Sequence, residues 1–192
     1  GVYTYQVKAK GYAKITDTLK IDKDSAATVK ITLAESKAWD GATKTPPSGD
    51  GTKDSPYQIE DGEMLAWLAD KVNGASATTV YAKLTEDIDL GDNPWTPIGM
   101  DSHEFMGTFD GNGYTVSGIH VNDVQNAGLF GVIKGVEIKN LTVSGKINGT
   151  ENAGGIAGQA KTSPCVFTNC GNEASVEGES AGGILGKIHS WN

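Results

Sequence analysis

Alternating apolar and polar residues at the start of the chain predict short β-strands. This alternation runs through residues 2–7, 19–22 and 27–33. In the last run Val29, Ile31 and Leu33 share one face, which we expect to point inward. Because a β-sandwich domain usually has about seven strands, residues 1–33 predict only a small, partial β-sandwich module.

A segment rich in Gly, Pro, Ser, Thr, Lys and Asp follows, and it predicts a linker over residues 34–56. Trp39 lies inside it. A Trp in a linker is usually held against a neighbouring domain, so we expect the chain to be ordered there. The start within a strand pattern and the uncapped end at Asn192 favour an excerpt from a longer, multidomain protein.

A single amphipathic helix is predicted over residues 61–73. Asp61 is a suitable N-cap and Asn73-Gly74 a suitable end. The apolar positions recur at three- and four-residue intervals, at Met64, Leu65, Trp67, Leu68 and Val72. We expect this face to cover the exposed end of a sheet.

Strand patterns with an internal repeat occupy the part of the chain that follows the predicted helix. Strands are expected at residues 80–84 and 87–90, and residues 108–116 predict two strands around an Asp-Gly/Asn-Gly turn. Gly128-Leu129-Phe130-Gly131 returns at Gly154 and again at Gly182, which gives spacings of 26 and 28 residues. Periods of this length with strand chemistry indicate a β-solenoid, with apolar residues filling a narrow core.

Alignment of the repeats predicts which residues stack on successive coils. Residues 136–141 match 165–170, and 143–145 match 176–178. Asn140 and Asn169 then fall at equivalent bends, where their amides are expected to form a ladder. Cys165 and Cys170 fall at core positions, which favours reduced thiols over a disulfide.

Composition and charge narrow the classes of partner that the chain is expected to bind. The 192 residues carry 16 basic and 24 acidic side chains, a net charge of −8, and every basic residue is Lys. An acidic chain without Arg disfavours nucleic acid and anionic lipid as partners. No apolar run approaches the roughly 20 residues that span a bilayer, so no membrane insertion is expected.

Several segments together resemble the GLUG-type repeat region of bacterial surface and adhesin-like proteins, which also occurs in immunoglobulin A1-cleaving metallopeptidases. The matching segments are residues 84–90, 95–99, 105–113 and the Gly-Leu-Phe-Gly and Gly-Gly-Ile-Ala-Gly repeats. The resemblance covers about residues 53–192 and implies an all-β fold: a right-handed parallel β-helix with one N-terminal capping helix. Residues 1–33 more loosely resemble an Ig-like or carboxypeptidase-regulatory-like module. The predicted organisation is therefore a partial β-sandwich over 1–33, a linker over 34–56 and a β-helix over 57–192.

Candidate chemistry is sparse. His103-Glu104 has no second His at the spacing of a zinc peptidase. Asp87, Asp89 and Asp92 are candidate calcium ligands at a coil corner, against the alternative of a polar face with turn formers; no other cofactor is expected. Scattered acids disfavour glycoside cleavage, which needs two carboxylates at a set separation.

The sequence therefore predicts a non-enzymatic repeat module of a secreted or cell-surface bacterial protein, acting as an adhesin or a rigid stalk. The alternative is a carbohydrate-binding or polysaccharide-processing β-helix. Trp39 and Trp191 are the candidate sugar-stacking residues. The expected partners are a host surface protein or glycan and the neighbouring domains of a longer chain.

Overall fold

The computed structural model of the protein describes residues 1–7, 12, 15–21, 28–33, 37–74, 79–161 and 164–189, without the side chains of Gln6 and Thr16. The chain divides into two compact units, residues 1–37 and 38–192. The sequence predicted a linker from residue 34 to 56. In the structure, residues 38–56 lie in the second unit.

The first unit contains one antiparallel hairpin of β1 (Val2–Val7) and β2 (Ile15–Lys20). A backbone hydrogen bond joins the open end of this hairpin: Ile21 N–H donates to the carbonyl of Gly1 at 2.8 Å. The strand predicted over residues 27–33 is wrong for the described residues 28–33, which form no strand. Val29 and Ile31 are 39% and 36% exposed, so the apolar residues of this alternating pattern are not buried against a sheet.

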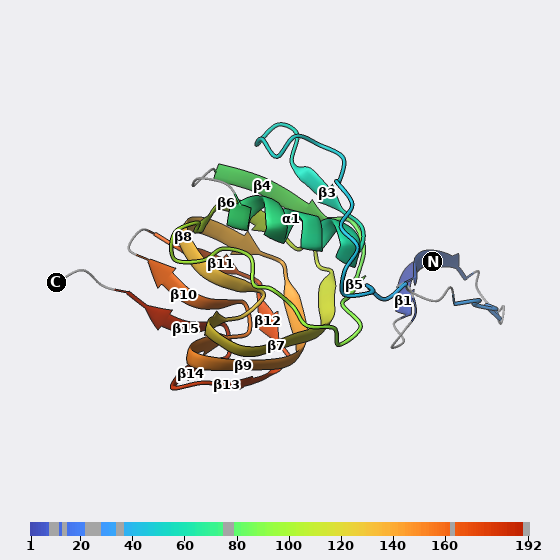
Figure 1. The fold of residues 1–192 in the computed structure, drawn as a ribbon. Helices are drawn as coiled ribbons and strands as arrows, with labels where there is room; N and C mark the ends of the chain where they lie inside the picture. Colours follow the sequence, from blue (N-terminus) through green and yellow to red (C-terminus); the bar gives the residue numbers. More distant parts are fainter. Residues whose placement is uncertain are drawn as a thin grey trace. The chain divides into compact units, whose positions relative to one another are not determined.

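The second unit is a parallel β-solenoid with one helix, α1 (Gly62–Gly74). Its strands follow one another along the chain as β3 (Tyr57–Ile59), β4 (Thr79–Leu84), β5 (Ile88–Asp89), β6 (Phe105–Asp110), β7 (Thr115–Ala127), β8 (Phe130–Lys139), β9 (Thr142–Gly154), β10 (Ala157–Lys161), β11 (Val166–Thr168), β12 (Gly171–Asn172), β13 (Ser175–Glu177), β14 (Ser180–Gly182) and β15 (Leu185–Ile188). Figure 1 shows these strands stacked in layers. One sheet runs β15-β10-β8-β6-β4-β3, with β11 also on β8. The other runs β12-β9-β7-β5, with β13 and β14 also on β9.

The register confirms that one sequence repeat is one coil. Gly182 pairs with Gly154, and Ala153 pairs with Ala127, which sets Gly154 beside Gly128. Val166 pairs with Glu137, which confirms the alignment of residues 165–170 with 136–141. The alignment of 143–145 with 176–178 is wrong, because Val176 pairs with Ile147 and Asn172 with Val143.

The turn over residues 111–114 separates two strands, as predicted, but it is not a hairpin. β6 pairs with β4 and β8, whereas β7 pairs with β5 and β9. Asn112 and Gly113 adopt positive φ angles of 53° and 82°. The same turn chemistry that closes hairpins thus turns the chain from one sheet of the solenoid to the other.

Helix α1 caps the solenoid as predicted. Asp61 Oδ1 accepts the N–H of Met64 at 2.9 Å, which is the N-cap bond. Leu65 and Leu68 are fully buried in the same cluster as Ile59, Leu84 and Phe109. The Asn73 amide donates to Pro97 O at 3.0 Å and accepts Gly99 N–H at 2.8 Å, which ties the end of the helix to a coil. None of the helices in the described residues is long and apolar enough to cross a bilayer.

Candidate functional site

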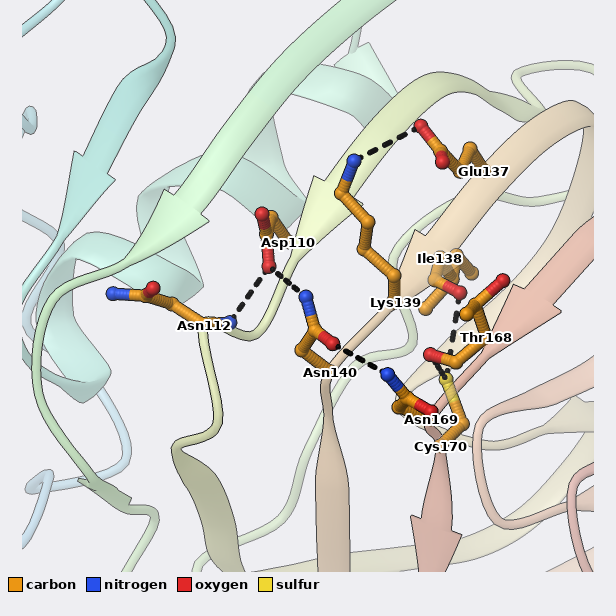
Figure 2. Close-up of polar contacts among 9 residues, drawn as sticks. All are labelled: Asp110, Asn112, Glu137, Ile138, Lys139, Asn140, Thr168, Asn169 and Cys170. Carbon is orange, nitrogen blue, oxygen red and sulfur yellow. Dashed lines mark hydrogen bonds and ion pairs between the residues drawn. The ribbon is translucent and has the colours of Figure 1, made fainter.

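A ladder of polar side chains runs along one corner of the solenoid, where the chain passes between the two sheets (Figure 2). Asn140 Nδ2 donates to Asp110 Oδ1 at 3.0 Å, and Asn169 Nδ2 donates to Asn140 Oδ1 at 3.1 Å. Asp110 Oδ1 also accepts the backbone N–H of Asn112 at 2.8 Å. The ladder predicted from Asn140 and Asn169 is confirmed, with a carboxylate at its head.

Backbone geometry explains why Asn occupies this corner. Asn140 and Asn169 both have φ of 52°, in the left-handed region. Asn tolerates this region better than other non-glycine residues because its short amide can bond locally. The corner therefore requires a residue that tolerates positive φ and also bonds to its equivalent on the next coil.

Two further amide pairs join β7 to β9. Asn152 Nδ2 donates to Asn126 Oδ1 at 2.8 Å, and Asn152 is only 3% exposed. On the surface, Asn148 Nδ2 donates to Asn122 Oδ1 at 3.1 Å. Sequence reasoning missed both pairs, although each is separated by the same 26 residues as Gly128 and Gly154. Side-chain bonds therefore fix the register of these coils at several points.

Both cysteines are free and half-buried against the core, as predicted. Cys170 Sγ lies 3.4 Å from Ile138 O and 3.6 Å from Thr168 O, next to the corner ladder (Figure 2). Burial raises the pKa of the Cys170 thiol, and the hydrogen bonds only partly offset this. The thiol is therefore protonated at neutral pH and a poor nucleophile.

The calcium site expected at Asp87, Asp89 and Asp92 stays a prediction, and two of these carboxylates already bond the backbone. Asp87 Oδ1 accepts the Thr115 N–H at 2.7 Å, and Asp89 Oδ1 accepts the Gly91 N–H at 2.9 Å. Asp92 is exposed, with φ of 56°. No cluster of three metal-ligating side chains occurs within the described part of the chain. Asp89 thus closes the turn that follows it, and Asp87 bonds to the start of β7.

Trp39, the candidate sugar-stacking residue, lies in the core cluster of the structure. Trp39 is 6% exposed, and its ring packs edge-on against Trp95 with centroids 5.7 Å apart. Its indole N–H donates to Thr43 O at 2.8 Å. With both faces covered, the ring is part of the core that anchors residues 38–43. Trp191 lies outside the described residues.

A polar clasp that sequence reasoning missed holds the loop between β5 and β6. Lys161 Nζ donates to Glu104 Oε1 at 2.8 Å and to Asp101 O at 2.5 Å. Burial alone would raise the pKa of Glu104, but the hydrogen bond and charge of Lys161 outweigh it and lower that pKa. Burial likewise opposes the charged form of Lys161, yet Glu104 and Asp101 raise its pKa above the ordinary value. No local signal connects residues 57 positions apart, so this clasp was invisible in the sequence.

The fold and this site define a parallel β-solenoid repeat protein. The chain is 35% identical over 119 residues to a candidate Gly-rich membrane protein of Evansella cellulosilytica, covering 57% of this chain and 13% of that protein. It is 27% identical to halomucin of Haloquadratum walsbyi, covering 97% of this chain and 2% of halomucin. The chain thus spans a small fraction of the curated relatives it matches.

Among solved structures, the chain is similar to a candidate immunoglobulin A1 protease from Bacteroides ovatus. The sequence identity is 19% and the TM-score 0.36, with 74% of this chain and 64% of that chain covered. No family model matches the chain, so the resemblance to GLUG-type repeats stays a prediction.

Proposed function

We propose that this chain is a non-enzymatic repeat module of an extracellular cell-surface protein, in which stacked coils form a stiff stalk. The observation that carries this proposal is the continuous parallel pairing from β3 to β15, reinforced at the corner by Asp110, Asn140 and Asn169. A solenoid grows by nearest-neighbour contacts, so its length scales with the number of coils. Two relatives much longer than this chain, one a halomucin and one a candidate membrane protein, support a surface setting.

The pKa shifts of two carboxyl groups disfavour a role for either one as a general acid in polysaccharide cleavage. A general acid for glycoside hydrolysis needs a carboxyl group with a raised pKa. The hydrogen bonds of Thr52 lower the pKa of Asp50. Lys161, overcoming the effect of burial, lowers that of Glu104. Both shifts run in the direction opposite to the one that a general acid needs.

A duplication series tests the stalk. Residues 130–156 form one coil, because Phe130 pairs with Ala157. Chains with one, two and three copies of this segment are compared by small-angle X-ray scattering and thermal unfolding. We expect the solenoid to lengthen by about 4.8 Å per copy with an unchanged cross-section, since each added coil contributes one strand spacing. Chains that widen, or that lose cooperative unfolding as copies are added, would contradict the proposal.

A further inference from the structure

The outermost strands of the solenoid, at the end away from α1, form an unpaired layer (Figure 1). β15 pairs with β10 alone, β11 with β8, and β12, β13 and β14 with β9. Within the described part of the chain, no strand pairs with the outer edges of these five strands. We name the layer formed by β11, β12, β13, β14 and β15 the open face. Its outward backbone N–H and C=O groups are those to which a further parallel strand would bond.

Apolar side chains on the open face are less buried than their equivalents one coil earlier. Ile138 and Ile147 are 0% and 2% exposed. Their register partners on the open face, Phe167 and Val176, are only partly buried against the same core. On β15, Ile188 is 72% exposed. The core therefore reaches the open face without a further layer of described residues over it.

The asparagine bonds between coils all have the same direction. In each of them the later coil supplies the side-chain N–H and the earlier coil supplies the oxygen. The donor and acceptor pairs are Asn140 to Asp110, Asn169 to Asn140, Asn148 to Asn122 and Asn152 to Asn126.

This direction gives the corner ladder two different ends. At its head, the Asp110 carboxylate accepts hydrogen bonds and has none to donate. At its other end, Asn169 is exposed on the open face (Figure 2). Asn169 has the same amide oxygen by which Asn140 accepts its bond. The open face therefore presents an acceptor suited to the amide of one more coil.

We propose that the open face binds a further coil of the same repeat class, which is a chain segment with aliphatic residues at the core positions and an asparagine that donates to Asn169. This inference rests on the proposed stalk and names the partner of its open end. The partner would repeat the parallel pairing already present between β8 and β10. Addition of a strand to an exposed sheet edge is an established mode of peptide recognition.

Charge disfavours a second copy of the whole chain as the occupant. Residues 165–182 contain no lysine and three exposed acids, Glu173, Glu177 and Glu179. Two open faces in contact would bring the acids of both copies together, and like charges repel. At the other end of a second copy, Leu65 and Leu68 of α1 already cover the core. Neither end of a second copy therefore matches the open face.

An internal coil has the matching chemistry. Residues 136–154 carry two lysines and two acids, so their charges cancel. Stacked on the open face in the register of the existing coils, Ile138 would lie over Phe167 and Ile147 over Val176. Lys146 would lie over Ser175, whose neighbours two positions away along the chain are both glutamates. Apolar and charged positions thus agree in one register.

The test uses a fluorescent peptide with the sequence of residues 136–154, titrated with the full chain and followed by fluorescence anisotropy. We expect saturable binding of this peptide and none of a scrambled peptide of the same composition. Asn140→Gly in the peptide removes the ladder donor and keeps a residue that tolerates positive φ, and it should weaken binding about fivefold. Asn169→Gly in the chain removes the acceptor and should weaken binding by about the same factor. Together the two changes should still weaken it only about fivefold, because they remove the same bond.

Two further variants of the chain test the position of the peptide. Val176→Lys places an ammonium group in the apolar contact and should weaken binding at least about tenfold. The matched control is Asn122→Ala, which removes an amide on β7, away from the open face, and should leave the affinity unchanged. Thermal unfolding of each variant checks that the chain is folded.

Three results would overturn the proposal. They are no binding by the folded wild type, equal binding of the scrambled peptide, and full additivity of the two glycine variants. A concentration-dependent dimer that the peptide dissociates would assign the open face to a second copy and would also overturn it. If the peptide fails to bind while the duplication series lengthens as expected, the stalk stands and only this inference fails.

Discussion

The corner ladder makes a quantitative prediction for Asn140. In Asn140→Ala the chain loses a hydrogen bond to the Asp110 carboxylate and another to Asn169, which measure 3.0 Å and 3.1 Å. Both lie at the surface or half-buried, so together they contribute about 2 kcal/mol. Alanine must also adopt φ of 52° at this position. That conformation adds about 1 kcal/mol, giving an expected loss of about 3 kcal/mol in the free energy of unfolding.

Two companion variants separate these contributions. Asn140→Gly loses the same bonds without the backbone strain, so it should cost about 2 kcal/mol. Asn148→Ala removes one exposed amide bond from an extended strand and should cost under about 0.5 kcal/mol.

Urea unfolding followed by circular dichroism measures all three. The urea midpoint should be highest for Asn148→Ala, lower for Asn140→Gly and lowest for Asn140→Ala. The slope of the unfolding free energy against urea concentration should not change. Equal costs for Asn140→Ala and Asn148→Ala would refute the claim that the corner ladder holds the coils together. Equal losses of unfolding free energy in Asn140→Ala and Asn140→Gly would refute the contribution assigned to backbone strain.

Three further predictions follow from the packing and from the pKa shifts. Because the pKa of folded Glu104 is lowered, its clasp stabilises the protein above the unfolded pKa and is lost as the pH falls through the folded value. Glu104→Gln should therefore cost about 1 kcal/mol at pH 7 and progressively less as the pH falls through the folded pKa, and a cost that does not change with pH would contradict the clasp. Burial raises the pKa of Cys170, so iodoacetamide at neutral pH should alkylate it about tenfold faster in unfolded than in folded chain, as read by mass spectrometry. Trp39→Ala should lower the free energy of unfolding by about 3–5 kcal/mol, because the ring fills the core beside Trp95; a stable variant would show that the ring is dispensable to packing.

Local chemistry made the solenoid predictable. The glycine repeats at 128, 154 and 182 are one coil apart, and the strands between them need no distant partner to be recognised. The corner pair of Asn140 and Asn169 followed from the alignment of residues 136–141 with 165–170. Asn122 and Asn148 have the 26-residue spacing of Gly128 and Gly154, so this second amide pair was present in the sequence and overlooked.

The features that the sequence could not predict depend on packing between residues that are far apart in the chain. The turn at Asn112-Gly113 has the chemistry of a hairpin, and only the coils on either side make it a corner. The sequence predicts that Trp39 is held against a neighbouring part of the chain, but it does not identify Trp95 as the partner. Asp87 and Asp89 share a strand pattern, but each carboxylate is already bound to a backbone N–H.

The lysines of the repeats show the same division between local signal and register. A Lys follows each glycine repeat within three residues, at Lys134, Lys161 and Lys187. The register alone shows that Gln159 lies beside Lys187 and that Lys161 lies beside Lys134. The sequence contained the repeated cations, and the strand pairing made them a surface.

The most direct test of the central claim, that successive repeats stack in register as coils, is a disulfide between equivalent positions. Cys165 and Cys170 are first replaced by Ala, and cysteines are placed at Asn122 and Asn148, whose side chains lie 3.1 Å apart. Adjacent parallel strands are about 4.8 Å apart, within the range a disulfide bridges. Mild oxidation should give a complete intramolecular 122–148 bond by mass spectrometry, and little bond in the offset pair Asn122→Cys/Thr150→Cys. Equal cross-linking of both pairs, or none in the first, would contradict the stacked-coil account.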